Sequence, residues 1–496
     1  MPVLATWDNH DYGSHNGGVE FPLKEMARTE FLDFFGEPRE SERRRSPGIH
    51  TARILGSEGR RVQLRNFSRR PAMTRNSAMH WPAILVLAGA CGLASPVLAE
   101  EEQAPEPSPG FGGPDAVENL IADDERLTPA MISKRLYQPW FDWKASVTER
   151  TGISFGIDYS ALYLASNNDA GNANASGGMV RFFGSWDLVG RGTKNAGALV
   201  WKVEHRHRYS DFSPFDATLG PYGYVGFIGA PFSNQQTRLT NLYWRQRFLD
   251  GRATAVGGYL DVTDYADTFI GGSPWTGFLN LAFSTGSASM FLPNDATLGL
   301  AAAGMLTDNL YVIGGLTNAY ADPTDPFRDS FERYFNDGEH FATLEIGWTK
   351  GQERIYQDNT HLTFWHVDDS ILAGAQRGWG LAFSHVQQLG ERWTPFLRGG
   401  YADDGGSLLQ KSVSAGFLYQ PKSAGDQLGV GLNWGQPNKT TFGPDLDNQI
   451  TAEAFYRLQV TPQFALTPNL EYIKDPALNP ENSSLWVIGL RARLAL

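Results

Sequence analysis

The chain has 496 residues, a formal net charge of −12 at pH 7 and a single cysteine, Cys91. The acidic balance and the lack of a basic stripe exclude nucleic acid as an expected partner, and one cysteine excludes a disulfide framework. No apolar run reaches the roughly 18–20 residues of a transmembrane helix, whereas a membrane β-barrel needs no such run.

Residues 1–72 contain the motif Thr-Trp-Asp-Asn-His-Asp-Tyr-Gly at positions 6–13. Residues 1–66 resemble an internal piece of the PhoD-like alkaline phosphatases, which are metallophosphoesterases, although Asn9 stands where that family has an aspartate. A binuclear metal site needs ligands from several loops. Asp8 and His10 are therefore interpreted as remnants without a functional metal. We expect residues 1–72 to be a fusion or a misassigned start, and the alternative is a fused fragment with some phosphatase activity.

Residues 73–99 have the pattern of a secretory signal peptide. A basic start is followed by an apolar run and by Val97-Leu98-Ala99, a small-residue cleavage site. We expect cleavage after Ala99 and export to the cell envelope. Such signals act at an N-terminus, which favours Met73 as the true start.

The next two segments are expected to precede a barrel. Residues 100–128 are acidic and rich in proline and glycine, which predicts a disordered linker. Residues 129–151 are predicted to form a short helix, capped by Thr128 and stopped by Gly152. Whether this helix lies at the periplasmic mouth or plugs the lumen is left open.

From residue 152 to residue 496 the hydrophobic pattern has a period of two. In the last strand, at 486–496, Trp486, Ile488 and Leu490 share one face, and Arg491 and Arg493 lie on the other. Similar alternation recurs at 201–209, 238–248, 340–349, 449–460 and 463–473. The pattern predicts an all-β fold, a 16-stranded antiparallel transmembrane β-barrel with 18 strands as the alternative. A soluble β-sandwich or propeller would alternate in the same way.

Turn lengths and the C-terminus favour the membrane barrel. Short turns at 249–252, 307–309, 390–392 and 461–462 contrast with long segments at 211–237, 263–277, 321–338 and 437–448, which we expect to be external loops. Tryptophans near strand ends suit contact with outer-membrane lipid. The final strand resembles the signal read by the barrel-assembly machinery, although such strands usually end in phenylalanine and this one ends in Leu496.

Residues 137–496 are similar to the carbohydrate-selective porins of the OprB family. The resemblance rests on the stretches at 152–159, 183–188, 238–246, 257–266 and 486–493, in this order. It implies a 16-stranded barrel in the outer membrane that passes sugars by diffusion and carries out no bond chemistry. A channel for another small solute is the alternative, and the oligomeric state, homotrimer or monomer, is open. We predict no cofactor and no enzymatic activity.

Side chains on the inward strand faces are the candidates for lining the pore and contacting sugar. Aromatic rings can stack on sugars, and mixed charges can bond their hydroxyl groups while keeping the lumen hydrated. The candidates are Glu204, Arg206, Arg208, Tyr243, Arg245, Arg247, Glu345, Arg398, Glu453, Arg457, Glu471, Arg491 and Arg493. Loop 211–237 is predicted either to fold inward as a constriction or to be a plain external loop. His205 and His207 share a strand face, but no third ligand has matching spacing, so we predict no metal site.

Overall fold

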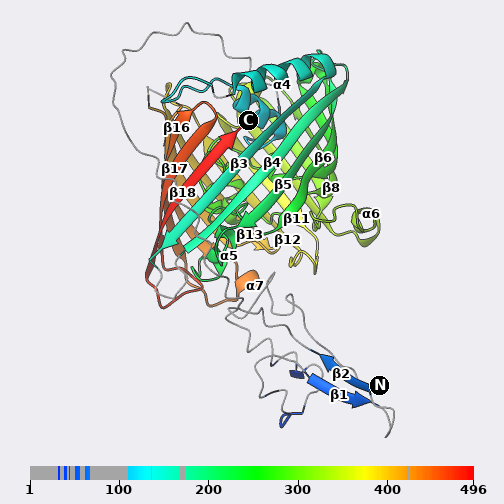
Figure 1. Ribbon diagram of the computed structural model, residues 1–496, viewed down its shortest axis with the longest axis vertical. Helices are drawn as coiled ribbons and strands as arrows, with labels where there is room; N and C mark the ends of the chain where they lie inside the picture. Colours follow the sequence, from blue (N-terminus) through cyan, green and yellow to red (C-terminus); the bar gives the residue numbers. More distant parts are fainter. Residues whose placement is uncertain are drawn as a thin grey trace. The chain divides into compact units, whose positions relative to one another are not determined.

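The structure is a computed structural model that divides into two compact units, Met1–Glu101 and Glu102–Leu496. It describes residues 29, 32–33, 38–41, 44, 51–55, 62–66, 110–135, 137–167, 174–421 and 425–496. In the first unit, β1 (Thr51–Leu55) and β2 (Val62–Asn66) form an antiparallel pair (Figure 1). The motif at 6–13 with Asp8 and His10, and the predicted signal peptide at 73–99, lie outside the described residues.

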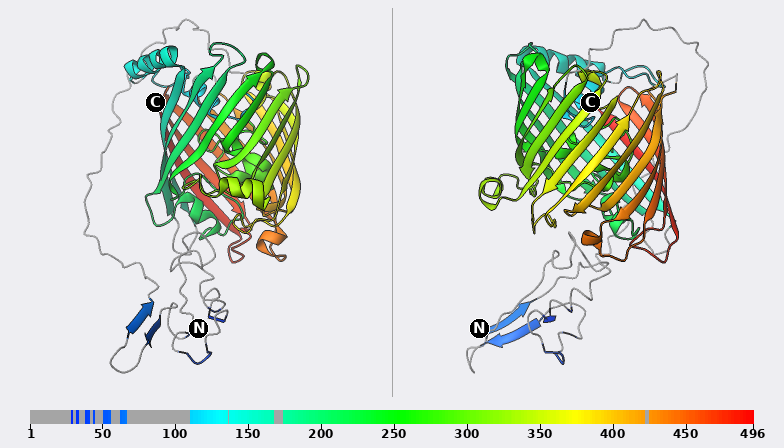
Figure 2. Two further views of the ribbon diagram at one scale, coloured as in Figure 1. Left: turned by 90° about the vertical axis from the view of Figure 1, so that its right-hand side faces the viewer. Right: turned by 180° about the vertical axis from the view of Figure 1, so that it is seen from behind.

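In the described part of the second unit, sixteen strands close into one antiparallel barrel, as predicted. Every strand pairs with its neighbours in sequence, and β18 closes the barrel against β3 (Figures 1 and 2). The strands are β3 Ile153–Ser166, β4 Asn174–Val189, β5 Gly197–Arg208, β6 Gln236–Phe248, β7 Ala253–Leu260, β8 Thr297–Met305, β9 Leu310–Asn318, β10 His340–Thr349, β11 Asn359–Val367, β12 Gly378–Val386, β13 Trp393–Asp404, β14 Leu409–Tyr419, β15 Gln427–Pro437, β16 Gln449–Thr461, β17 Phe464–Lys474 and β18 Ser484–Ala495.

The alternation of side chains sets the two faces of the wall. In β18, Trp486, Ile488 and Leu490 are about half exposed on the outer face, whereas Val487 and Arg491 are buried toward the lumen. Strands such as β10, β11 and β12 repeat this alternation, as the period of two requires. The sequence prediction of an apolar outside and a charged inside is thereby confirmed.

In the described part of the second unit, two helices precede the barrel, and they differ from the predicted single helix. Helix α3 (Val117–Glu125) lies within the segment predicted to be a disordered linker, and α4 (Gln138–Thr151) begins nine residues after Pro129. Residues 131 and 132 are not helical, and their backbone N–H groups donate to the carbonyls of Gln459 and Val460 at the end of β16. Tertiary pairing therefore overrides the local helix signal there. The predicted stop at Gly152 is confirmed by its left-handed φ of 77°.

The described loops are short at one end of the barrel and long at the other. The short ends include the predicted turns near 249–252 and 307–309, and the long connections include 209–235, 261–296 and 319–339. Short helices α5 (Pro214–Leu219), α6 (Ser330–Glu332) and α7 (Lys439–Phe442) lie in the long connections (Figure 1). No helix in the described residues is long and apolar enough to cross a membrane.

Candidate functional site: the barrel lumen

Helix α3 packs against the inner wall of the barrel. Its apolar residues Val117, Leu120 and Ile121 follow helical spacing and are buried against Phe183 of β4 and Val200 of β5. This stripe explains why an acidic segment forms a helix here, since burying it supplies the packing that the isolated sequence lacks. Helix α3 therefore lies inside the barrel, although residues 100–128 were predicted to be a disordered linker and the lumen was considered only for the helix predicted at 129–151.

Charged pairs fix α3 to the wall. The carboxylate of Glu118 forms ion pairs with both Arg245 and Arg247 of β6. At the other end of the helix, Nη2 of Arg493 on β18 donates to both carboxylate oxygens of Asp124, at 2.8 and 3.0 Å. Three of the predicted pore residues therefore hold α3.

The connection between β7 and β8, residues 261–296, also folds into the lumen. Asp267 in this loop receives a 2.5 Å contact from Arg398 Nη2 and lies 2.8 Å from His361 Nε2. Its backbone N–H donates to Glu345 Oε2 at 2.8 Å. Burial alone would raise the pKa of Asp267, but the charges and hydrogen bonds of Arg398 and His361 outweigh burial and lower it.

The second half of the same loop is held by the opposite wall. The carboxylate of Glu453 accepts from the backbone N–H groups of Leu279 and Asn280, at 2.8 and 3.0 Å. Glu471 accepts from Asn280 Nδ2 at 2.7 Å, and Arg491 donates to the carbonyl of Gly277 at 3.0 Å. The prediction of an external loop at 263–277 is therefore wrong, because inward charges of distant strands provide the partners of this backbone.

Loop 211–237 packs against the β7–β8 loop inside the barrel. Tyr222 and Tyr224 are fully buried, and the hydroxyl group of Tyr224 donates to Asn280 Oδ1 at 3.0 Å. An isolated β-bridge joins Ile228 to Asn280. Of the two alternatives for this loop, the structure has the inward one, because the loop is joined to the β7–β8 loop, which inward side chains of the wall hold.

A polar row along β5 faces the start and the end of the β7–β8 loop. Lys202 Nζ lies 2.9 Å from Asp264 Oδ1. Farther along the strand, Arg206 pairs with Glu204 at 2.5 Å and with Asp295 at 3.1 Å. Each of these side chains has an opposite charge within contact, as buried charges require.

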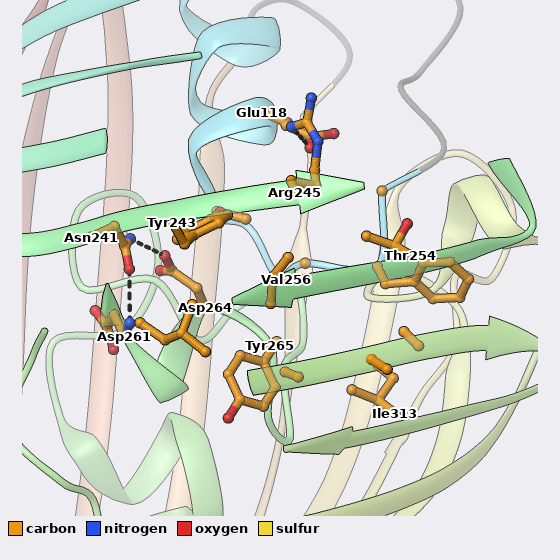
Figure 3. Close-up of a pocket in the computed structure, with 18 of the residues that line it drawn as sticks. Glu118, Asn241, Tyr243, Arg245, Thr254, Val256, Asp261, Asp264, Tyr265 and Ile313 are labelled. Atoms are coloured by element: carbon orange, nitrogen blue, oxygen red, sulfur yellow. Dashed lines mark hydrogen bonds and ion pairs between the residues drawn. The ribbon is translucent and has the colours of Figure 1, made fainter. Parts of the chain in front are cut away.

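A cavity remains between α3 and the wall formed by β6 to β9 (Figure 3). Its empty volume is about 710 Å³, part of which is open solvent. Polar lining comes from Glu118, Asn241, Arg245, Arg247, Asp261 and Asp264, beside the ring of Tyr243. The lining combines one aromatic face with hydrogen-bond donors and acceptors on several sides.

Asp261, at the edge of the cavity, titrates close to neutral pH. Burial and the neighbouring carboxylates of Asp264 and Asp295 raise its pKa to about 7, against the opposing effect of Lys202. Asn241 joins the Asp264 carboxylate to the backbone of Asp261, because its Nδ2 donates to Asp264 at 2.6 Å and its Oδ1 accepts from the backbone N–H of Asp261 at 2.7 Å (Figure 3).

The remaining predicted residues are dispersed. Arg208 is exposed at the end of β5 and donates to the carbonyl of Asp211 at 2.7 Å, whereas Arg457 is half-buried with its guanidinium 3.4 Å from the carbonyl of Thr276. His205 lies on the outer face with His207, their rings 5.5 Å apart. The structure thus gathers Tyr243, Arg245 and Arg247 at the cavity. Most other candidates form clamps, by which we mean the ion pairs and hydrogen bonds that hold α3 or the lumen loops to the wall.

Sequence reasoning missed several residues that shape the lumen. Asp158 of β3 accepts from Arg181 Nε at 2.9 Å and from Arg493 Nε at 2.9 Å, and all three side chains face inward. Asp261 and Asp264 were overlooked because they lie in a loop. Asp158 and Arg181 occupy inward-facing positions in strands that are otherwise mostly apolar, and this placement could have identified them as lumen residues.

Three comparisons place this barrel among known proteins. Residues 141–496 match the family model of the carbohydrate-selective porins, OprB family. No curated protein matches the chain. The high-pH structure of Pseudomonas putida OprB is 16% identical, with a TM-score of 0.57, over 74% of this chain and 99% of that one.

Two further solved structures are more distant. The low-pH structure of P. putida OprB is 14% identical, with a TM-score of 0.45, over 73% of this chain and 98% of that one. A mutant of the Rh. blastica porin is 10% identical, with a TM-score of 0.43, over 69% of this chain and 100% of that one. The family match spans well over half of the sequence and coincides with the sixteen-stranded barrel, and the chain therefore belongs to the OprB family of carbohydrate-selective porins.

Proposed function

We propose that this protein is an outer-membrane porin through which small carbohydrates diffuse passively, and that solutes are selected in the cavity beside α3. The observation that carries the proposal is the grouping of Tyr243, Arg245 and Arg247 with Asp261 and Asp264 around one cavity. A sugar is neutral, with an apolar ring face and a rim of hydroxyl groups. The ring of Tyr243 suits the face, and the carboxylates and guanidinium groups suit the hydroxyl groups.

The clamps give this cavity its selectivity in the proposed mechanism. Because α3 and the β7–β8 loop are tied to the wall by buried charge pairs, the opening between them has a fixed width. Charges of both signs keep the passage hydrated without strong preference for anions or cations. Diffusion through such a passage needs no bond chemistry, so we expect no catalytic residue and no cofactor in the barrel.

The decisive test is conductance in planar bilayers with sugars added on one side. We expect the double variant Arg245→Ala/Arg247→Ala to change single-channel conductance and to weaken current block by sugars. The matched control is Arg252→Ala, because Arg252 is 44% exposed in a turn and pairs only with the exposed Asp308 in the described contacts. An unchanged double variant would remove these arginines from the pathway.

The arginines also hold α3, so a second variant separates the two roles. Glu118→Gln removes the charge that anchors α3 but keeps both arginines at the cavity. We expect it to raise conductance while sugar block persists. If sugar block is lost equally in Glu118→Gln and in the arginine variant, the arginines act through α3 and do not contact sugar. Block by another solute and not by sugars would favour the alternative cargo.

Processing and assembly belong to the same proposal. We expect the exported protein to begin at Glu100, which N-terminal sequencing of the outer-membrane form tests. The C-terminal strand at 486–496 is proposed as the segment read by the barrel-assembly machinery, and deleting it should abolish membrane insertion. Cross-linking in the membrane distinguishes a monomer from a homotrimer. Phosphate-ester hydrolysis by the purified full chain, in a metal-replete assay, would show that residues 1–72 keep phosphatase activity.

A further inference from the structure

The connection between β9 and β10, residues 319–339, turns outward over the barrel wall, and we call it the flap. It contains α6 and the helical turn Arg333–Asp337. Figures 1 and 2 show α6 standing off the outside of the barrel at the end of the long loops. The backbone N–H of Leu239 in β6 donates to the carbonyl of Pro323 at 2.9 Å, so the flap reaches back across β8 and β7 to β6.

The flap covers the outward side chains at the long-loop ends of these strands. Tyr259 of β7 and Leu298 of β8 lie on the outer face but are only 7% and 9% exposed. They pack with Tyr334, and the ring of Phe327 meets the ring of Tyr259 edge-on at 5.1 Å. Leu300, two residues farther along the same face of β8, is 61% exposed. The region covered by the flap therefore ends at the exposed apolar outer face of the wall that includes Leu300.

The flap's own surface is unusually apolar. Phe327, Phe331 and Phe335, each four residues apart, are 63%, 59% and 71% exposed. The rings of Phe331 and Phe335 are nearly parallel, with centroids 6.4 Å apart. Three large exposed rings within nine residues mark a contact surface, because leaving them in water forfeits the free energy of burying them.

We propose that the flap lies on the outer leaflet of the membrane and inserts these three phenylalanines at the boundary between headgroups and acyl chains. Its apolar side continues the outer face of the wall, on which Leu300, Leu316 and Leu344 are exposed. Amphipathic segments bind bilayer surfaces in this way through their apolar side. The membrane that surrounds the barrel is therefore the surface nearest to the rings.

Charge favours lipid over a second copy of the same surface. Residues 319–339 contain six acidic and two basic residues, a net charge of −4. Two such flaps facing one another would repel. Electrostatic attraction to anionic headgroups is also lacking, so ring burial must supply the contact, and the contact should hardly change with salt concentration.

Spin-label accessibility tests the proposal in the full chain. A Cys91→Ser background allows a single nitroxide at Phe331→Cys or Phe335→Cys, in dimyristoylphosphatidylcholine vesicles. The matched control is Asp337→Cys, on an exposed polar position of the same helical turn. Leu300→Cys provides the lipid reference, and Asp308→Cys, whose native side chain is 89% exposed, provides the water reference. Heat-modifiable gel mobility confirms that each variant folds.

We expect the labels at positions 331 and 335 to behave like the lipid reference, accessible to oxygen and shielded from a water-soluble nickel chelate, at both low and high salt. The label at position 337 should resemble the water reference. Nickel accessibility at 331 and 335 equal to the water reference would overturn the proposal. Shielding from both oxygen and nickel would also overturn it, since it would place the rings in a protein contact with a second copy.

Discussion

Replacing Arg398 with methionine should release the first half of the β7–β8 loop while leaving the barrel closed. Arg398 is 1% exposed, and its guanidinium contacts Asp267 at 2.5 Å, Ser384 Oγ at 2.8 Å and the ring of Phe269 at 4.2 Å. Removing one partner of a buried ion pair costs about 3–5 kcal/mol, because the other charge is left unpaired. Since His361 still contacts Asp267, we expect a value near 3 kcal/mol, which is about a 100-fold rise in the opened loop population.

Hydrogen exchange and single-channel recording measure this release. Amides in the first half of the β7–β8 loop, around Asp267, should exchange about 100-fold faster in Arg398→Met, while those of β12 and β13 keep their protection. Conductance should rise and become noisier as the loop leaves the lumen. Arg377→Met is the matched control, because Arg377 is 67% exposed, and its contacts with Asp368 and Asp369 are 3.8 and 3.9 Å long. Such exposed pairs contribute only about 0–1 kcal/mol. Unchanged hydrogen exchange of the loop in Arg398→Met would refute the role of Arg398 in holding the loop.

Two further predictions concern the cavity and α3. Burial and the neighbouring Asp264 raise the pKa of Asp261 to about 7. Raising the pH from about 6 to about 8 should therefore ionise Asp261 and increase the cation preference of the channel, which the reversal potential measures. The variant Asp261→Asn should abolish this change. The native state binds the proton of Asp261 more tightly than the unfolded chain does. The contribution of Asp261 to the free energy of unfolding therefore falls as the pH rises from about 4 to about 7. A free energy of unfolding that is independent of pH over this range would contradict the raised pKa. Arg493→Met should leave Asp124 unpaired and loosen α3, seen as faster exchange of its amides, with unchanged exchange as the contrary result.

The barrel could be predicted from the sequence because its determinants are local. Each strand carries its own alternation, and the final strand shows it best, with Ile488 and Leu490 outside and Arg491 and Arg493 inside. Strand number follows from counting such segments, and pairing of sequence neighbours follows from short turns. Nothing in this reasoning requires knowledge of a contact between distant residues.

The contents of the lumen could not be predicted in the same way. The segment at 263–277 has the glycine, proline and aspartate content of an external loop, and its inward position depends on Asp267 meeting Arg398, 131 residues later in the chain. Composition also hid α3, because the acidic residues around it are typical of a solvated linker. The stripe of Val117, Leu120 and Ile121 was a readable helical signal, but its burial depends on the wall that it meets.

The ion pairs and hydrogen bonds between the wall and the lumen loops change the role that we assign to the inward charges. A charge on an inward strand face is expected to line water, yet Glu345, Glu453, Glu471 and Arg491 each bind backbone or side chains of a lumen loop. Buried polar groups need such partners, and an irregular loop inside a barrel exposes backbone groups that need them equally. The inward charges of the wall and the backbone groups of the loop therefore serve as hydrogen-bonding partners for each other. We therefore propose that the residues left at the open cavity, Tyr243, Asp261 and their neighbours, are the ones whose remaining hydrogen-bonding capacity a passing sugar would use. Substitutions there should alter selectivity more than they alter the width of the channel.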